Sequence, residues 1–220
     1  GSKAPADLVV CIIRDSEYEI VDNWHVMGLR GTGSKQAVVK SLFVPTRRAL
    51  SLFTLDKTPA PGRVLHDNPF YGGPASPVFY AEIAAVAVGI AWGAIDIFTE
   101  RARTKTNAFR PDVKLFEYPA TQRRLAAATA ELDTAAAMLL QQAQAYMDLT
   151  ALRVPMGETL SLEERAHMQL QLQHCVEMAA KVVDRLFVAG GSSAMNDGEA
   201  MQRCFRDINA LRTHYLMDGD

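Results

Sequence analysis

The first part of the chain alternates short apolar runs with turn-forming residues. The runs DLVVCIIR, EYEIVDNWHV and QAVVKSLFVP are rich in β-branched and aromatic side chains, and polar or glycine-containing turns separate them. This pattern predicts three or four β-strands. Since no helical stretch lies between them, the strands are expected to pair antiparallel, and so few strands make only part of a β domain.

From Pro77 to the end, the apolar residues follow a helical period in four segments. The first, roughly Val78 to Arg103, is apolar nearly all round, which predicts a helix with neighbours on every side. The second, about Pro119 to Arg153, is rich in alanine. A Ser161–Glu164 capping box opens the third, which ends at a glycine pair, and Asp197–Met217 forms the fourth. Four helices with short connections predict an antiparallel bundle.

These patterns predict the fold class α+β, in which a partial antiparallel β domain precedes an antiparallel four-helix bundle. Residues 1–2 are interpreted as a cloning remnant and residues 3–55 as the second half of a β domain. Residues 56–77, rich in proline and glycine, are interpreted as a linker, and residues 78–220 as the bundle. The change of period at the end of the linker therefore marks the main boundary in the chain.

Composition narrows the class of function. A net charge of -2 predicts no nucleic-acid-binding surface. Cys11, Cys175 and Cys204 are odd in number and widely spaced, so neither a disulfide framework nor a metal site is predicted, and a cytoplasmic protein is expected. The apolar run 81–97 is short for a membrane span and contains two carboxylates, which favours a buried helix.

A glycine pair, Gly190 and Gly191, interrupts the helical pattern before the last segment. A polar turn follows, in which Asn196 or Asp197 is expected to cap the last helix. A helix end, a loop of bare backbone and a helix start with arginines behind it form a cradle suited to a phosphate. The same sequence also suits a tight corner of a helix bundle, and the residues alone leave both interpretations open.

Two motifs resemble those of the acyl-CoA dehydrogenase superfamily. WHVMGLRGTGS, at 24–34, is similar to the second half of its β domain, and FVAGGSSA followed by QRCFRDINALRTH is similar to its C-terminal four-helix domain. More narrowly, the chain resembles the reduced-flavin-dependent monooxygenases, which are the oxygenase components of two-component aromatic hydroxylases. The resemblance covers nearly the whole chain but not the family's N-terminal helical domain and first strands. A C-terminal part of such an enzyme is therefore expected.

The resemblance implies the following chemistry. A separate flavin reductase supplies reduced FMN or FAD, oxygen adds at the flavin C4a position, and the resulting hydroperoxide hydroxylates a small aromatic substrate in a dry pocket. The protein's share is to position the reactants and exclude water. The family is typically homotetrameric. FMN and FAD remain equal alternatives, because a phosphate cradle suits both.

The resemblance further implies a catalytic role for His214. Many acyl-CoA dehydrogenases carry a glutamate shortly after the last Arg-Asp, whereas this chain has Thr213-His214-Tyr215 at that place. A histidine there is similar to the monooxygenase branch, in which an imidazole acts as a base toward a phenol or as a donor toward the oxygenated flavin. The alternative is an ordinary surface histidine in a terminal helix.

Two other functions stay open. Some acyl-CoA dehydrogenases carry their base on the first bundle helix, and Glu82 falls near that place, although a glutamate there also suits interaction with the helix dipole. An FAD-dependent dehydrogenase with Glu82 as base is therefore the second hypothesis. The third is a non-catalytic helical assembly domain that has the fold but binds no flavin.

The remaining site residues come from the resemblance. Phe70 lies in the linker, where related hydroxylases have a loop over the substrate, and is expected to contact the substrate. Each cofactor candidate has a structural alternative, such as a core tryptophan, a hairpin turn or compensation of a helix dipole. The residues expected to bind flavin are Trp24, Ser34, Arg101, Arg103, Gly190, Gly191 and Ser192.

Overall fold

The computed structural model describes residues 9–51, 62–66 and 68–217. They form two compact units. Among the described residues, the first unit comprises 9–26, 30–51, 62–66, 68–78 and 144–165, and the second comprises 27–29, 79–143 and 166–217. Each unit thus combines segments that lie far apart in the sequence.

The first unit contains four three-residue strands. Strand β1 (Val9–Cys11) pairs antiparallel with β4 (Ala49–Ser51), and β2 (Glu19–Val21) pairs antiparallel with β3 (Gln36–Val38). The predicted antiparallel pairing is therefore confirmed. The strands are short, and apolar residues of this region such as Ile12 and Phe43 are exposed, so the pairs form no closed core of their own.

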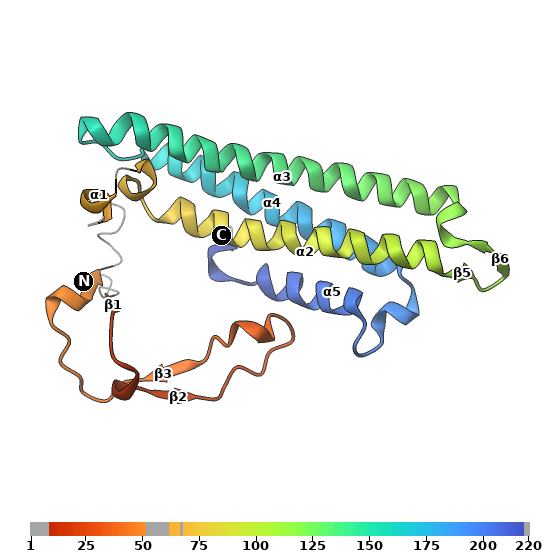
Figure 1. The fold of residues 1–220 in the computed structure, drawn as a ribbon, viewed down its shortest axis with the longest axis horizontal. Helices are drawn as coiled ribbons and strands as arrows, with labels where there is room; N and C mark the ends of the chain where they lie inside the picture. The colour runs from red at the N-terminus through yellow and green to blue at the C-terminus, as the bar shows by residue number, and fades with distance from the viewer. Residues whose placement is uncertain (1–8, 52–61, 67, 218–220) are drawn as a thin grey trace, which may run out of the picture. The chain divides into compact units, whose positions relative to one another are not determined.

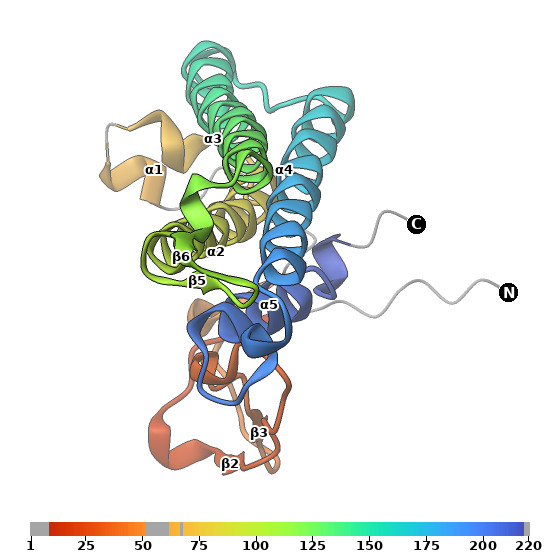
Figure 2. The same ribbon diagram turned by 90° about the vertical axis from the view of Figure 1, so that its right-hand side faces the viewer.

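Four long helices, α2 (Ser76–Thr104), α3 (Pro119–Arg153), α4 (Leu162–Ala189) and α5 (Ala200–Leu211), run alongside one another in alternating directions (Figures 1 and 2). The predicted bundle is confirmed, and with it the α+β fold class. The sequence pattern did not predict a small hairpin between α2 and α3, in which β5 (Thr106–Asn107) pairs with β6 (Arg110–Lys114).

The predicted linker also contains regular structure. A one-turn helix, α1 (Gly62–Leu65), and a 3₁₀ turn at Pro69–Gly72 precede α2. Part of the segment 56–77 lies outside the described residues. Proline and glycine favour turns over long elements, which explains why a periodicity argument finds no helix there.

The ends of the last two helices test the capping predictions. At α4, Ser161 Oγ accepts from the Glu164 amide at 3.1 Å, and the Glu164 carboxylate accepts from the Ser161 amide at 2.7 Å, so the predicted capping box is confirmed. At α5 the prediction was wrong. The N-cap is Glu199, with no side-chain cap hydrogen bond, because Gly198, with a φ of 86°, turns the chain once more before the helix begins.

Small side chains make the helix core. Alanines line the buried face of α2 at a spacing of three and four residues, which lets the neighbouring helices approach closely. Fully buried residues of α2 to α4 include Ala84, Ala87, Ala91, Ala94, Leu132, Ala135, Cys175, Ala179, Val183 and Leu186.

The expectation that α2 is buried on every side is wrong for the chain by itself. Its opposite face is exposed and, apart from Glu82, is apolar in its first half, with Val86 at 48% and Phe79 at 43% exposure. Its length and composition alone would also suit a membrane span. Because an exposed apolar helix face usually contacts a partner, this face bears on assembly.

Candidate functional site

The two glycines at the end of α4 are required for different reasons. Gly190 is buried, and a Cβ there would lie only 2.9 Å from the Ala194 Cβ. Gly191 has a φ of 68° and a ψ of −170°, a conformation that L side chains rarely adopt. Ser192, which is exposed, then begins a 3₁₀ turn that ends at Met195. Glycine is therefore required at both positions for the chain to turn toward α5.

Arg101, near the end of α2, binds this corner. Its Nη2 donates to the Gly190 carbonyl at 3.0 Å and to the Ser193 hydroxyl. Arg103 lies elsewhere, because two residues correspond to a rotation of about 200° around the helix. Its guanidinium is 5.8 Å from the centre of the Phe116 ring. The structure thus brings one of the two predicted arginines to the corner.

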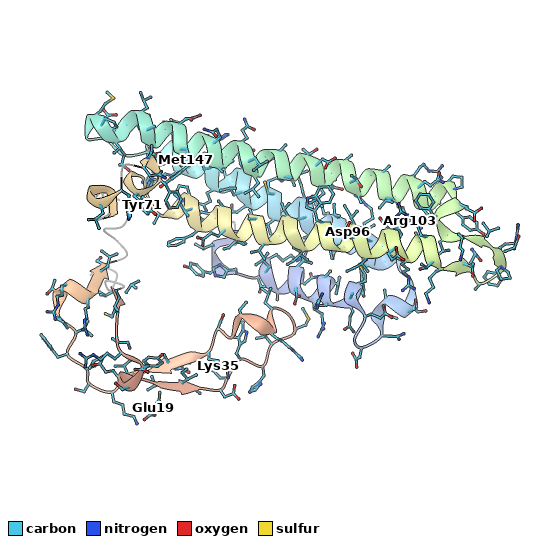
Figure 3. The ribbon with its side chains drawn as sticks, viewed as in Figure 1. Glu19, Lys35, Tyr71, Asp96, Arg103 and Met147 are labelled. Carbon is cyan, nitrogen blue, oxygen red and sulfur yellow. The ribbon has the colours of Figure 1, made fainter. Side chains whose placement is uncertain are left out.

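An open cleft of about 630 Å³ lies beside Arg101. Arg101, Lys105, Thr104 and Ser193 offer donors that suit a phosphate, and carboxylates on the same cleft accept hydrogen bonds from hydroxyl groups. This donor set fits a flavin nucleotide, which carries both groups. Figure 3 labels Asp96, one of these carboxylates, and Arg103, which lies further along α2 and does not line the cleft. The cleft is lined by Asp96, Ile97, Glu100, Arg101, Thr104, Lys105, Ser193, Asn196, Glu199 and Met201.

Sequence reasoning named Ser192 and missed its neighbour Ser193. Both serines are exposed, but it is the hydroxyl of Ser193 that bonds Arg101. Lys105 and Asn196 also line the cleft and were not predicted as site residues. Two adjacent serines after a glycine pair give no local signal that tells which one faces α2. Only the direction of the 3₁₀ turn distinguishes them.

His214 follows the end of α5 and is exposed. Its Nδ1 accepts from the Leu216 amide at 3.2 Å, and its ring lies 4.7 Å from that of Tyr215. Because Nδ1 is an acceptor, the neutral imidazole carries its proton on Nε2, which is then a donor. The geometry leaves this histidine able to donate a proton or hydrogen bond outward.

His214 and the glycine corner lie at opposite ends of α5. The helix has 12 residues, which corresponds to a length of about 18 Å. The predicted catalytic histidine and the predicted phosphate cradle are therefore not part of one small pocket within this chain.

Trp24 and Ser34 belong to the first unit. Trp24, which is half-buried, and Ser34, whose hydroxyl is 2.9 Å from that of Thr32, lie on the connection between β2 and β3. The side chains of Asn23 and Gln36 bond each other and hold the two ends of this connection together. Trp24 and Ser34 thus lie on one loop.

Phe70 and Glu82 have exposed side chains. Phe70 is 41% exposed on the turn before α2, where its ring contacts those of Tyr71 and Tyr146 edge-on. Glu82 lies on the exposed side of α2 near its start. Both are accessible to a ligand.

Residues 81–219 match the family model of the acyl-CoA dehydrogenase C-terminal domain, and the chain belongs to this family. It is 34% identical, over 98% of its length, to the flavin-dependent monooxygenase oxygenase subunit HsaA of Rhodococcus jostii (strain RHA1), covering 56% of that protein. It is 30% identical, over 95% of its length, to the oxygenase component of p-hydroxyphenylacetate 3-hydroxylase from Acinetobacter baumannii, covering 49% of it.

The solved structures agree with the sequence relatives. The crystal structure of 3-HSA hydroxylase from Rhodococcus sp. RHA1 superposes with a TM-score of 0.81 at 32% identity, over 98% of this chain and 53% of that one. The chain therefore spans about half the length of the curated relatives it matches.

Proposed function

We propose that the protein acts as the oxygenase component of a two-component, flavin-dependent monooxygenase that hydroxylates a small aromatic substrate. One observation carries the proposal. The similarity to the Rhodococcus jostii monooxygenase subunit extends over 98% of the chain, so it includes the strands as well as the bundle. The Acinetobacter relative is likewise named as an oxygenase component, which supports a separate flavin reductase as partner.

Reduced FMN or FAD, when bound, supplies the oxygen-activating chemistry. Arg101, the Gly190–Gly191 backbone and the polar turn that contains Ser192 and Ser193 bind its phosphate, and their donor set supports this role. Trp24 and Ser34 would contact the ring system through an aromatic face and a hydroxyl. Arg103, whose guanidinium lies over the Phe116 ring, is not assigned to the phosphate. His214 is the catalytic residue of this proposal, and its hydrogen bond from the Leu216 amide, which leaves the proton on Nε2, supports a role as hydrogen-bond donor.

The separation of His214 from the corner supports a homotetramer with shared sites. One chain then offers His214 to one flavin and the glycine corner to the flavin of a neighbouring subunit. The exposed apolar face of α2 supports such an assembly, since it would be buried there. Three free cysteines support a cytoplasmic location.

The test uses the full-length polypeptide and needs no known substrate at first. The protein is mixed anaerobically with reduced FMN, or with reduced FAD, and then with oxygenated buffer, and the appearance of oxidised flavin is followed by stopped flow. We expect a clear delay relative to free flavin and, with a panel of phenols that includes p-hydroxyphenylacetate, hydroxylated product. Oxidation as fast as that of free flavin would reject the proposal.

His214 is tested in the same assay. His214→Asn is expected to lower the yield of hydroxylated product about a hundredfold, because proton donation or abstraction typically contributes that much. His174→Asn is the matched control, since His174 is an exposed histidine on α4. Equal losses in both variants would remove His214 from the chemistry.

The dehydrogenase hypothesis has its own test. Glu82 is exposed near the start of α2 in the chain by itself. Tightly bound oxidised FAD that is bleached by acyl-CoA, and no longer bleached in Glu82→Gln, would favour that function. A full-length protein that binds neither FMN nor FAD would support the assembly-domain hypothesis.

A further inference from the structure

The turn that carries Phe70 is attached to α3 along one stripe of side chains. Tyr146, Thr150 and Val154 recur at intervals of four residues, so they lie on one face of the helix and its extension. All three are buried. The opposing segment, Pro69–Pro74, carries Gly72 and Gly73 at the points of closest approach. We call this segment the Phe70 loop; Figure 3 labels Tyr71 on it and Met147 on α3.

Both glycines of the Phe70 loop are required by this contact. A Cβ on Gly73 would overlap the methyl group of Thr150 and lie 2.5 Å from the hydroxyl oxygen of Tyr146. A Cβ on Gly72 would lie 2.8 Å from a methyl group of Val154. The backbone of the loop therefore rests directly on the α3 stripe, with no side chain between them.

The hydroxyl group of Tyr146 makes a polar connection between the loop and α3. Tyr146 is only 6% exposed. Its hydroxyl lies 3.1 Å from the carbonyl oxygens of both Phe70 and Pro74, and its one proton is shared between these acceptors. The same tyrosine contacts the Phe70 ring edge-on, with centroids 6.1 Å apart. Tyr146 thus restrains the loop at both ends and the aromatic side chain itself.

An open cavity of about 390 Å³ adjoins the contact between the Phe70 loop and α3. Both partners line it: His66, Asn68, Pro69 and Gly72 come from the loop and the residues before it, and Thr150, Ala151, Val154 and Pro155 come from α3 and its extension. The contact is therefore not closely packed along its whole length, and the loop has room to shift once the hydroxyl bonds are lost.

We propose that Tyr146 is a positioning residue for substrate specificity, whose hydroxyl fixes the Phe70 loop on α3 and thereby fixes Phe70 as a wall for the aromatic substrate. The inference rests on the proposed hydroxylase function. It adds a residue that touches neither substrate nor flavin and acts through Phe70.

The experiment compares Tyr146→Phe with the wild type in the full-length protein, using the phenol that gives the highest product yield. Removal of the hydroxyl keeps the ring. We expect KM to rise about five- to tenfold, as for the loss of one buried hydrogen bond, with a larger share of hydrogen peroxide relative to hydroxylated product. The delay in flavin oxidation without substrate is expected to stay unchanged.

A second variant perturbs the same contact from the other side. Gly73→Ala adds a methyl group that must displace the loop from Tyr146 and Thr150, so it is expected to raise KM and peroxide release at least as much. Thr150→Val is the matched control. It keeps the methyl group that faces Gly73 and loses a hydroxyl whose bonds, among the described residues, go to the Tyr146 and Met147 carbonyls of its own helix.

The outcomes separate the two proposals. Wild-type protein that shows no delay in flavin oxidation and no product contradicts the proposed function. Wild-type protein that hydroxylates, with Tyr146→Phe unchanged in KM and in the ratio of product to peroxide, overturns the role of Tyr146. A fall in thermal stability alone, equal to that of Thr150→Val, also overturns it, because the role would then be structural.

Discussion

The backbone N–H of Leu29 donates a 2.7 Å hydrogen bond to the carboxylate of Asp207, 178 residues further along the chain. Arg206, the preceding residue of α5, donates to the Met27 carbonyl at 3.4 Å. Leu29 itself has a φ of 54°, which is unusual for a side chain of this kind and costs free energy. Two side chains of α5 thus hold the Met27–Leu29 strap, and this contact connects the two motifs that carry the family resemblance.

Gly28, at the centre of the strap, is predicted to tolerate no side chain. A Cβ there would overlap the carbonyl oxygen of Arg206 and lie 2.9 Å from the Asp207 nitrogen. Because backbone atoms of a packed helix cannot move aside cheaply, Gly28→Ala is expected to lower the free energy of unfolding by about 2–3 kcal/mol. Thermal or urea denaturation measures this.

Gly31→Ala is the control for Gly28→Ala. Gly31 is exposed, and a Cβ there would meet nothing within 4 Å. Its effect on the free energy of unfolding is expected to stay within about 0.5 kcal/mol. Equal effects of the two substitutions would show that the strap does not pack on α5 in solution.

Arg101 and Arg103 are predicted to differ in flavin binding. Arg101 bonds the glycine corner, whereas Arg103 lies over Phe116. Arg101→Ala removes charge-assisted hydrogen bonds and is expected to weaken flavin binding about tenfold or more. Arg103→Ala is expected to change the Kd about twofold at most. Anaerobic titration of the full-length protein with reduced FMN measures both, and a larger effect at Arg103 would contradict the assignment.

Glu164 is predicted to make stability depend on acid pH. The hydrogen bond from the Ser161 amide, and then the one from Arg153, lower the pKa of its carboxyl below 4.5. Since the charged form is favoured in the folded state, its contribution is present above pH 4.5 and is lost as the pH falls through the lowered value.

Glu164→Gln is therefore expected to lower the free energy of unfolding by about 1 kcal/mol at pH 7, as the loss of a helix cap does. The difference from wild type should shrink below pH 4.5. Glu163→Gln, one residue away and exposed, is the control. Denaturation curves between neutral and acid pH measure this. A difference in the free energy of unfolding between wild type and Glu164→Gln that stays constant with pH would contradict the capping role.

Only one thiol is predicted to react quickly in the native chain. Burial raises the pKa of Cys175 to about 11 and also raises that of Cys204, whereas Cys11 is exposed. Because the thiolate is the reactive form, the two buried thiols are protected at pH 8 in two ways: they are protonated, and the reagent cannot reach them. Titration with a chromogenic disulfide should count one thiol before denaturation and three after it, and Cys11→Ser should remove the fast one. Two fast thiols in the native protein would contradict this burial.

Much of the fold followed from local sequence. Alanine content and a proline start predicted α3 at its observed bounds, and the Ser161–Glu164 box predicted the start of α4. These features depend on residues within one helical turn of each other, so a single sequence contains the information. The predicted start of α5 was wrong because it also relied on local sequence alone. Asn196 and Asp197 are good N-cap residues, but the turn at Gly198 delays the beginning of the helix.

By itself, then, the sequence determined the helices, the antiparallel strands, the glycine corner and the family to which the chain belongs. The tertiary structure alone decided which partners meet. It brings Arg101 rather than Arg103 to the corner, Ser193 rather than Ser192 to Arg101, Asp207 to Leu29, and Tyr146 to the Phe70 loop. Periodicity predicts which face of an element is buried. The partner of that face depends on how distant segments pack, and this packing cannot be predicted from the local sequence.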